Sequence, residues 1–297
     1  MLNNAAISTG DMVNIAISKE KCRKCNQCLD ACPLTQCLGF KTLEDTGLRS
    51  MCIRCGSCMA ICSHEAISVE GLAAASPVAP IPSSDEMLNL IRQRRSIRAF
   101  KSQPINPDDW RKLLEAVKYA PTGHNVQWID IMIIQSPEVL GKLAQAGMEM
   151  FRELSQRVNK PILSSIYKRM LGPHTYSVFS KSSYFYQQQV EMVIQGKDPV
   201  LFNAPAIMLF LGSKTELMAK TEADLAAQSV ALYAPTLGLA TCYSGIVSAS
   251  FSGMYPGIKK IVEIPDGYTV HNALIVGYPK YTLPYVPYRK ERNVYYV

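Results

Sequence analysis

The sequence predicts a two-part α+β protein, in which a small cysteine-rich domain precedes a larger domain with a sheet flanked by helices. Nine of the ten cysteines lie from Cys22 to Cys62, eight of them in a repeat, a proline-rich stretch follows them, and helix starts then alternate with short apolar runs. A chain of 297 residues is long enough for one small and one medium domain. We predict a first domain over residues 1–72, a linker over 73–86 and a second domain over 87–297.

The overall composition is that of a soluble globular protein. Hydrophobic residues make up 48% and charged residues 19% of the chain, and every apolar run is shorter than the roughly 18 residues that span a bilayer. The first residues lack the basic and apolar regions of a secretory signal, so we expect a cytoplasmic protein with no membrane partner. The net charge of +7 is spread along the chain, which argues against a nucleic-acid partner and favours an anionic cofactor or an acidic partner protein.

The cysteine-rich segment contains an internal repeat. The pattern Cys-x2-Cys-x2-Cys-x3-Cys occurs from Cys22 to Cys32 and again from Cys52 to Cys62. This is the spacing of bacterial ferredoxins, in which three close cysteines bind one [4Fe–4S] cluster and the fourth binds the other cluster. One expected ligand set is Cys22, Cys25, Cys28 and Cys62. The other expected set is Cys52, Cys55, Cys58 and Cys32.

Zinc is the alternative metal for such a segment. Zinc sites usually pair Cys-x2-Cys units across longer loops, whereas here four cysteines fall in one short run. Ser63 stands where Pro33 stands in the first copy, which removes a rigid turn but no ligand. Cys37 and Cys242 lie outside the repeat, and we expect neither to bind metal.

Several helices are predicted after the linker. Asn106 is a capping residue, Pro107 takes the first helical position, and acidic residues follow in the first turn. Ser136 begins the same pattern. A further helix is expected over residues 222–237, with an end or kink near Pro235 because proline lacks a backbone N–H.

Apolar runs typical of buried strands lie between these helices, over residues 129–134, 206–211 and 273–276. No Gly-x-Gly-x-x-Gly motif follows a strand and no P-loop motif occurs, so neither a Rossmann site nor a P-loop is expected. No Gly-x-Ser-x-Gly elbow occurs either, which argues against a hydrolase of that class.

Four segments of the second domain indicate its chemistry. Arg94–Arg98 holds three guanidinium groups and a hydroxyl, which suit a phosphate, although such a cluster can also be a solvated helix end. Ala120–Trp128, Gly238–Gly245 and Ile264–Tyr268 follow in order. Together these segments resemble the FMN-dependent nitroreductase family, over roughly residues 87–289. The resemblance implies a nitroreductase-like sheet flanked by helices, and FMN as a cofactor.

The resemblance also implies which residues bind FMN. The arginine segment would contact the phosphate, the ribityl chain and the pyrimidine edge, and the segment from Cys242 would line the flavin ring. The segment from Pro121 would reach the flavin of the other subunit of a homodimer, and a basic pair near the carboxyl end would close on the phosphate unless it is a charged tail. The implied ligands are Arg94, Arg95, Ser96, Arg98, Pro121, Thr122, Gly123, Asn125, Gln127, Cys242, Tyr243, Ser244, Gly245, Arg289 and Lys290.

We assign no catalytic side chain, because the cofactors would carry the chemistry. The expected function is an oxidoreductase in which two [4Fe–4S] clusters pass single electrons to or from FMN, which reduces a small organic acceptor such as a nitroaromatic or a quinone. Ferredoxin, or NAD(P)H, is the expected electron donor. Two alternatives stay open: an electron-transfer module that exchanges electrons with a partner protein, and reverse flow that oxidises a substrate.

Overall fold

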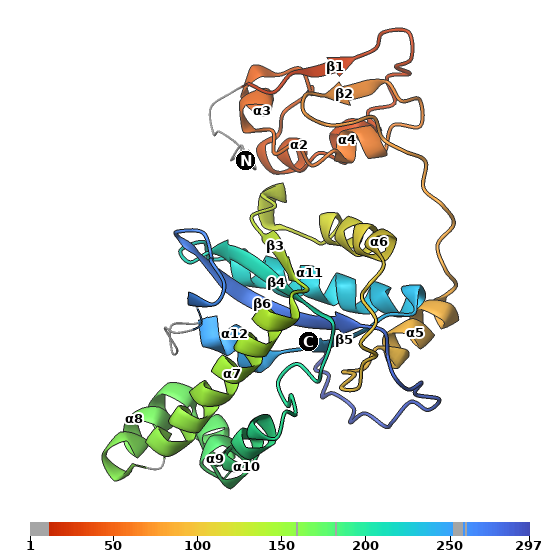
Figure 1. Ribbon diagram of the computed structural model, residues 1–297. Coiled ribbons are helices and arrows are strands. Elements are labelled where there is room, and N and C mark those ends of the chain that lie inside the picture. The colour runs from red at the N-terminus through yellow and green to blue at the C-terminus, as the bar shows by residue number, and fades with distance from the viewer. Residues whose placement is uncertain (1–11, 159, 182, 252–257, 259) are drawn as a thin grey trace. The chain divides into compact units, whose positions relative to one another are not determined.

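The computed structural model describes residues 12–297 except 159, 182, 252–257 and 259. The chain divides into two compact units (Figure 1). The first unit is Met1–Ile81 with Thr122–Gln127, and the second is Pro82–Pro121 with Trp128–Val297. The described part of the chain has no helix long and apolar enough to cross a membrane.

The first unit is built on one short antiparallel strand pair, in which Ile15 pairs with Val69. Its strands are β1 (Ile15–Ile17) and β2 (Ile67–Val69). Its helices are α1 (Gln27–Asp30), α2 (Pro33–Leu38), α3 (Thr46–Met51), α4 (Ser57–Ala60) and the 3-10 turn η1 (Gly123–Asn125). The small core combines aliphatic residues such as Leu43 and Leu48 with the side chains of Cys32 and Cys58.

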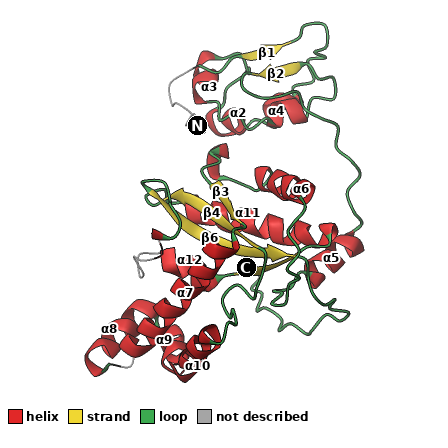
Figure 2. Cartoon of the chain, viewed as in Figure 1, coloured by secondary structure: helices red, strands yellow, loops and turns green. Residues whose placement is uncertain are grey.

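The second unit contains an antiparallel sheet with the strand order β3-β4-β6-β5 (Figure 2). The strands are β3 (Asp130–Ile134), β4 (Ala206–Ser213), β5 (Ala240–Tyr243) and β6 (Tyr268–Gly277). The three apolar runs predicted as strands are confirmed as β3, β4 and β6. β5 was not predicted, because its four residues mix apolar and polar types and adjoin a glycine-rich turn.

Helices cover this sheet or connect its strands. They are α5 (Ser84–Gln93), α6 (Pro107–Lys118), α7 (Pro137–Val158), α8 (Pro161–Leu171), α9 (Pro173–Lys181), α10 (Ser183–Ile194), α11 (Ala219–Tyr233), the 3-10 turn η2 (Ala234–Leu237) and α12 (Gly245–Ala249). The start at Asn106 is confirmed, since its side chain accepts a hydrogen bond from the Asp108 N–H at 2.9 Å. The predicted end of a helix near Pro235 is confirmed too, because α11 ends at Tyr233 and a 3-10 turn follows.

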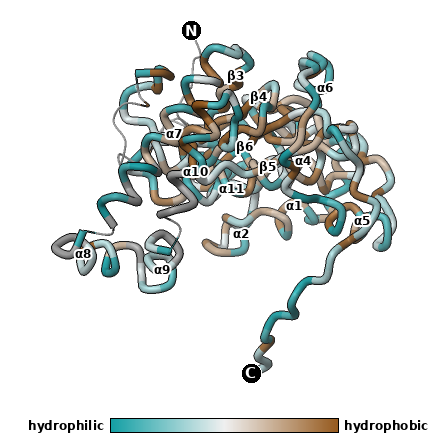
Figure 3. Tube along the Cα trace, turned by 60° about the horizontal axis from the view of Figure 1, so that its bottom comes forward, coloured by the Kyte–Doolittle hydropathy of each residue, from teal (hydrophilic) through white to brown (hydrophobic). Residues whose placement is uncertain are grey.

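The sheet is covered on both faces, so β4 is buried along nearly its whole length. Phe210 faces a core shared with α6 and α11, whereas its neighbour Leu209 faces a core shared with α7 and α12. Alternation along a strand explains this division, because successive side chains point to opposite faces. In Figure 3 the hydrophobic part of the trace includes these central strands. The α+β class with a helix-flanked sheet is therefore confirmed.

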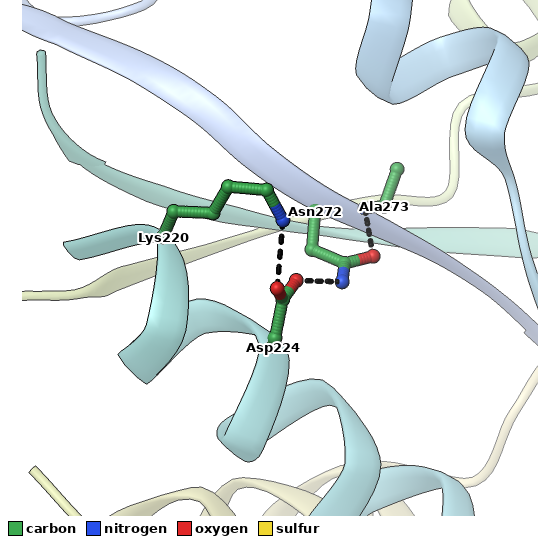
Figure 4. Close-up of polar contacts among 4 residues, drawn as sticks. All are labelled: Lys220, Asp224, Asn272 and Ala273. Carbon is green, nitrogen blue, oxygen red and sulfur yellow. Dashed lines mark hydrogen bonds and ion pairs between the residues drawn. The ribbon is translucent and has the colours of Figure 1, made fainter. Parts of the chain in front are cut away.

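A polar contact joins α11 to β6 beside a bulge in the sheet. Phe210 of β4 pairs with Asn272 of β6, and the register between the two strands shifts between Phe210 and Leu211. The Asn272 Nδ2 donates to Asp224 Oδ1 at 2.7 Å, and Lys220 Nζ donates to the other carboxylate oxygen at 2.7 Å (Figure 4). This contact fixes the helix against the irregular part of the strand.

Gly277, at the end of β6, is expected to tolerate no side chain. A Cβ there would lie 2.7 Å from Pro205 Cδ and 2.9 Å from Phe100 Cδ1. Gly277→Ala should therefore lower the free energy of unfolding by about 1–3 kcal/mol, measured by chemical denaturation. Gly141→Ala in α7 is the control, because its Cβ meets nothing within 4 Å and alanine should stabilise the helix by up to about 1 kcal/mol. Equal effects at both glycines would contradict this prediction.

Candidate functional site

Eight cysteines of the first unit line two separate cavities. Each cavity takes three cysteines from one copy of the repeat and one from the other copy. One cavity, of about 380 Å³, is lined by Cys22, Cys25, Cys28 and Cys62. The other is lined by Cys32, Cys52, Cys55 and Cys58. The structure thus brings the predicted ligands together in the crossed grouping that the ferredoxin spacing implies.

The backbone of the two cysteine loops turns in the same unusual way. Lys24 and Arg54, at equivalent positions of the two copies, have φ values of 55° and 48°. Such left-handed backbone costs a non-glycine residue roughly 1–2 kcal/mol, so surrounding contacts must stabilise it. The turn directs an N–H at a sulfur: Lys24 N donates to Cys22 Sγ at 3.4 Å, and Arg54 makes the corresponding backbone hydrogen bond to Cys52.

The thiols of the second cavity are in an environment that disfavours free negative charge. Burial, with the nearby Cys52, Cys55 and Cys32, raises the pKa of Cys58 to about 11. Burial also raises the pKa of Cys52 in this cavity and of Cys28 in the first cavity. Thiolates in such a cavity need positive charge to compensate them, which iron supplies. In the described part of the chain no three His, Cys, Asp or Glu side chains are placed so that they could hold a single metal ion.

The second unit contains a larger cavity, of about 760 Å³, next to the end of β5. Five residues predicted to bind FMN line it: Arg98, Cys242, Tyr243, Ser244 and Gly245. β5 positions Cys242 and Tyr243 on the cavity wall, and Ser244 then caps α12 by accepting from the Val247 N–H at 3.4 Å. The Arg98 guanidinium lies 5.8 Å from the centre of the Phe202 ring, which also lines the cavity.

Arg94 and Ser96 lie beside this wall without lining the cavity. Ser96 pairs with Thr241 of β5, and the Ile97 N–H donates to the Thr241 carbonyl at 3.0 Å. Burial raises the pKa of Cys242, while the charges of Arg98 and Arg94 and a hydrogen bond with the Ser96 side chain lower it. Arg95 is half-buried and is not among the residues that line the cavity.

Burial raises the pKa of Tyr243 to about 12, against the lowering charge of Arg94. The Tyr243 hydroxyl donates to Gln228 Oε1 at 3.0 Å. This tyrosine therefore stays neutral at ordinary pH and serves as a fixed hydrogen-bond donor.

Comparison with known proteins identifies both parts of the chain. Residues 91–278 match the nitroreductase family, and residues 14–63 match a 4Fe-4S dicluster domain. The chain belongs to the nitroreductase family. It is an oxidoreductase of that family, with an iron–sulfur domain before the family's fold.

Individual relatives of this family are distant. A 4-nitrobenzoate reductase from Nocardioides sp. (strain LMS-CY) is 22% identical over 69% of this chain and 85% of its own length. An FMN reductase (NADPH) from Bacillus subtilis is 25% identical over 65% of both chains. An NADPH-dependent oxidoreductase from Staphylococcus epidermidis is 31% identical over 64 residues, 26% of its length.

Solved structures share the fold of the second unit. A nitroreductase with bound FMN from Desulfitobacterium hafniense has a TM-score of 0.53 at 19% identity, over 71% of this chain and 98% of that chain. An FMN-dependent nitroreductase from Clostridium difficile has a TM-score of 0.50 at 20% identity, over 71% of this chain and all of its own (100%).

Other predicted FMN ligands are not among the residues that line the cavity of this nitroreductase-family unit. Thr122, Gly123, Asn125 and Gln127 belong to the first unit. Pro121 is exposed and does not line the cavity. Arg289 and Lys290 are exposed as well, in the largely hydrophilic segment that ends the chain (Figure 3).

Several residues that line the cavity lie outside the sequence motifs and are not predicted from the sequence as FMN ligands. They include Gln189, Met192, Lys197, Phe202, Asn203 and Lys280. One local signal was available: Asp198 precedes a proline and forms a turn, in which its Oδ1 accepts from Val200 N at 3.0 Å and Leu201 N at 2.7 Å. That turn positions Phe202 on the cavity wall.

Proposed function

We propose that the first unit binds two [4Fe–4S] clusters, that the second unit binds FMN, and that single electrons pass between them. The reduced flavin then transfers electrons to a small organic acceptor, a nitroaromatic or a quinone. The observation that carries this proposal is the division of eight cysteines into two cavities, four to each. The proposed domain limits are residues 1–72 and 87–297, joined by 73–86.

The residues present fit the clusters. Soft thiolates select iron–sulfur clusters, and each cluster needs four of them. Hydrogen bonds from backbone N–H groups to the sulfurs, such as Ala66 N to Cys62 Sγ at 3.3 Å, are the kind that tune such clusters. When bound, the clusters supply one-electron transfer.

The residues of the larger cavity fit FMN. Arg98, Lys197 and Lys280 bring positive charge for a phosphate or for a reduced flavin. Gly245 lines the cavity, and a Cβ on it would meet no atom within 4 Å, so a flat ring can approach its backbone closely. The FMN bound in the Desulfitobacterium structure supports this assignment, and FMN would supply hydride or single-electron transfer to the acceptor.

A small-molecule acceptor is favoured over a purely protein partner. The cavity of about 760 Å³ lies in the upper half of the range of about 300–1,000 Å³ usual for ligand sites, so we infer that it has room for a small acceptor beside the flavin. The name of the Nocardioides relative, a 4-nitrobenzoate reductase, supports a nitroaromatic. The family resemblance further supports a homodimer with FMN at its interface and a ferredoxin, or NAD(P)H, as donor.

The electron route is tested by adding reduced ferredoxin or NADH, separately and anaerobically, to the purified protein while flavin absorbance is followed. Reduced ferredoxin should bleach the flavin, and Cys25→Ala or Cys55→Ala should slow bleaching at least about tenfold, because each removes a cluster ligand. Cys37→Ala is the control, since that exposed thiol lines neither cysteine cavity. Bleaching by NADH alone, at a rate that cluster loss leaves unchanged, would disprove the route.

A further inference from the structure

The side chain of Asn125 donates hydrogen bonds to the loop between Cys52 and Cys55, which lines the second cysteine cavity. Its Nδ2 donates to the Ile53 carbonyl at 3.1 Å and to the Arg54 carbonyl at 3.0 Å, all within the first unit. Ile53 and Arg54 are the two residues between Cys52 and Cys55, and both line the cavity with them. Sequence resemblance had implied a flavin contact for Asn125, and the structure gives its amide these different partners.

One of these carbonyls belongs to a peptide group whose N–H is hydrogen-bonded to a cysteine of this cavity. The Ile53 carbonyl shares its peptide group with the Arg54 N–H, and Arg54 makes the backbone hydrogen bond to Cys52. The Arg54 carbonyl shares its group with the N–H of Cys55. A donor on a carbonyl polarises the peptide group and strengthens the hydrogen bond at its N–H end. Asn125 therefore acts on the Cys52 sulfur through one peptide group.

The amide of Asn125 is held ready for this contact. Gln127 Nε2 donates to Asn125 Oδ1 at 3.2 Å, which fixes the Asn125 NH₂ group towards the loop. Asn125 and Gln127 have φ values of 57° and 50°. Asparagine is among the few residues that adopt such backbone readily. The strained segment is therefore shaped to present this one donor group.

The first copy of the repeat has the same backbone turn, and the described part of the chain gives it no such support. Lys24 is the counterpart of Arg54, with a φ of 55° and its own N–H to sulfur bond. Among the described residues no side chain donates to the carbonyls of Arg23 and Lys24. The contact from Asn125 thus distinguishes two otherwise matched cysteine loops.

We infer that Asn125 is a positioning residue that raises the reduction potential of the cluster bound by Cys32, Cys52, Cys55 and Cys58. The inference rests on the proposed clusters. Hydrogen bonds to the sulfurs stabilise the more negative, reduced state, and they are one of the determinants of cluster potential. In a singly reduced protein this shifts the electron-exchange equilibrium towards this cluster, which gains the electron that the cluster bound by Cys22, Cys25, Cys28 and Cys62 gives up.

Asn125→Gly tests the inference, because glycine accepts the left-handed backbone and removes only the amide. His124→Gly is the matched control: His124 is the exposed neighbour, with a φ of 51°. Anaerobic potentiometry followed by EPR should show a lower potential for one cluster in Asn125→Gly. The electron-exchange equilibrium between the clusters should shift by a factor of about 2–10, the value of one hydrogen bond. His124→Gly should match the wild type.

A second variant guards against a purely structural effect. Asn125→Asp keeps the shape and the backbone tolerance but cannot donate when ionised, so its potential should fall in the same direction. Equal cluster potentials in wild type, Asn125→Gly and Asn125→Asp, with full iron content, would overturn the inference. Wild-type protein that takes up no iron or sulfide would instead overturn the proposed function, so the two failures are distinguishable.

Discussion

Cys25→Ser combined with Cys62→Ser is expected to remove no more iron than either replacement alone. Both cysteines line the same cavity although they come from different copies of the repeat. Each single variant should retain one cluster, about four irons per chain, and the double variant should retain the same cluster. Cys25→Ser combined with Cys32→Ser should lose both clusters, because Cys32 lines the other cavity.

The measurement is iron and acid-labile sulfide per chain after anaerobic reconstitution, with EPR of the reduced protein. Cys37→Ser should retain the full content, since Cys37 lines neither cavity. If each copy of the repeat bound its own cluster, the results would be reversed. The double variant of Cys25 and Cys32 would then lose one cluster, and the double variant of Cys25 and Cys62 would lose both. The pattern of the two double variants therefore decides between crossed and uncrossed ligation.

The cysteine arrangement could be predicted because the information is local. Metal ligands at fixed spacing in a short segment leave few ways to wrap a cluster. The helix start at Asn106 and the apolar run of β4 were predictable for the same reason, since a cap and a buried strand are each set by a few neighbouring residues.

The rest of the site depends on tertiary packing. Lys197 and Phe202 reach the cavity wall through a turn at Asp198, and no pattern in the sequence joins that turn to Gly245. Asn125 shows a second limit. Its hydrogen bonds to the carbonyls of Ile53 and Arg54 could not be predicted, because these partners lie far away in the sequence and are brought to the side chain by the fold.

Gly245→Leu is expected to weaken FMN binding by about 10- to 100-fold while the protein remains folded. Gly245 lines the large cavity, and its added Cβ would meet no protein atom within 4 Å. The leucine side chain would therefore occupy space that the flavin needs. Overpacking of a filled site typically costs about 1–3 kcal/mol, which corresponds to the stated loss of affinity.

The matched control is Gly245→Ala, whose single methyl group should weaken binding much less than leucine does. The dissociation constant is measured by flavin fluorescence on protein stripped of FMN, and folding is checked by chemical denaturation. A graded loss from alanine to leucine, with an unchanged free energy of unfolding, places the flavin against Gly245. Wild-type affinity in Gly245→Leu would instead show that FMN does not use this wall, and the assignment of Arg98 and Tyr243 as its neighbours would fail with it.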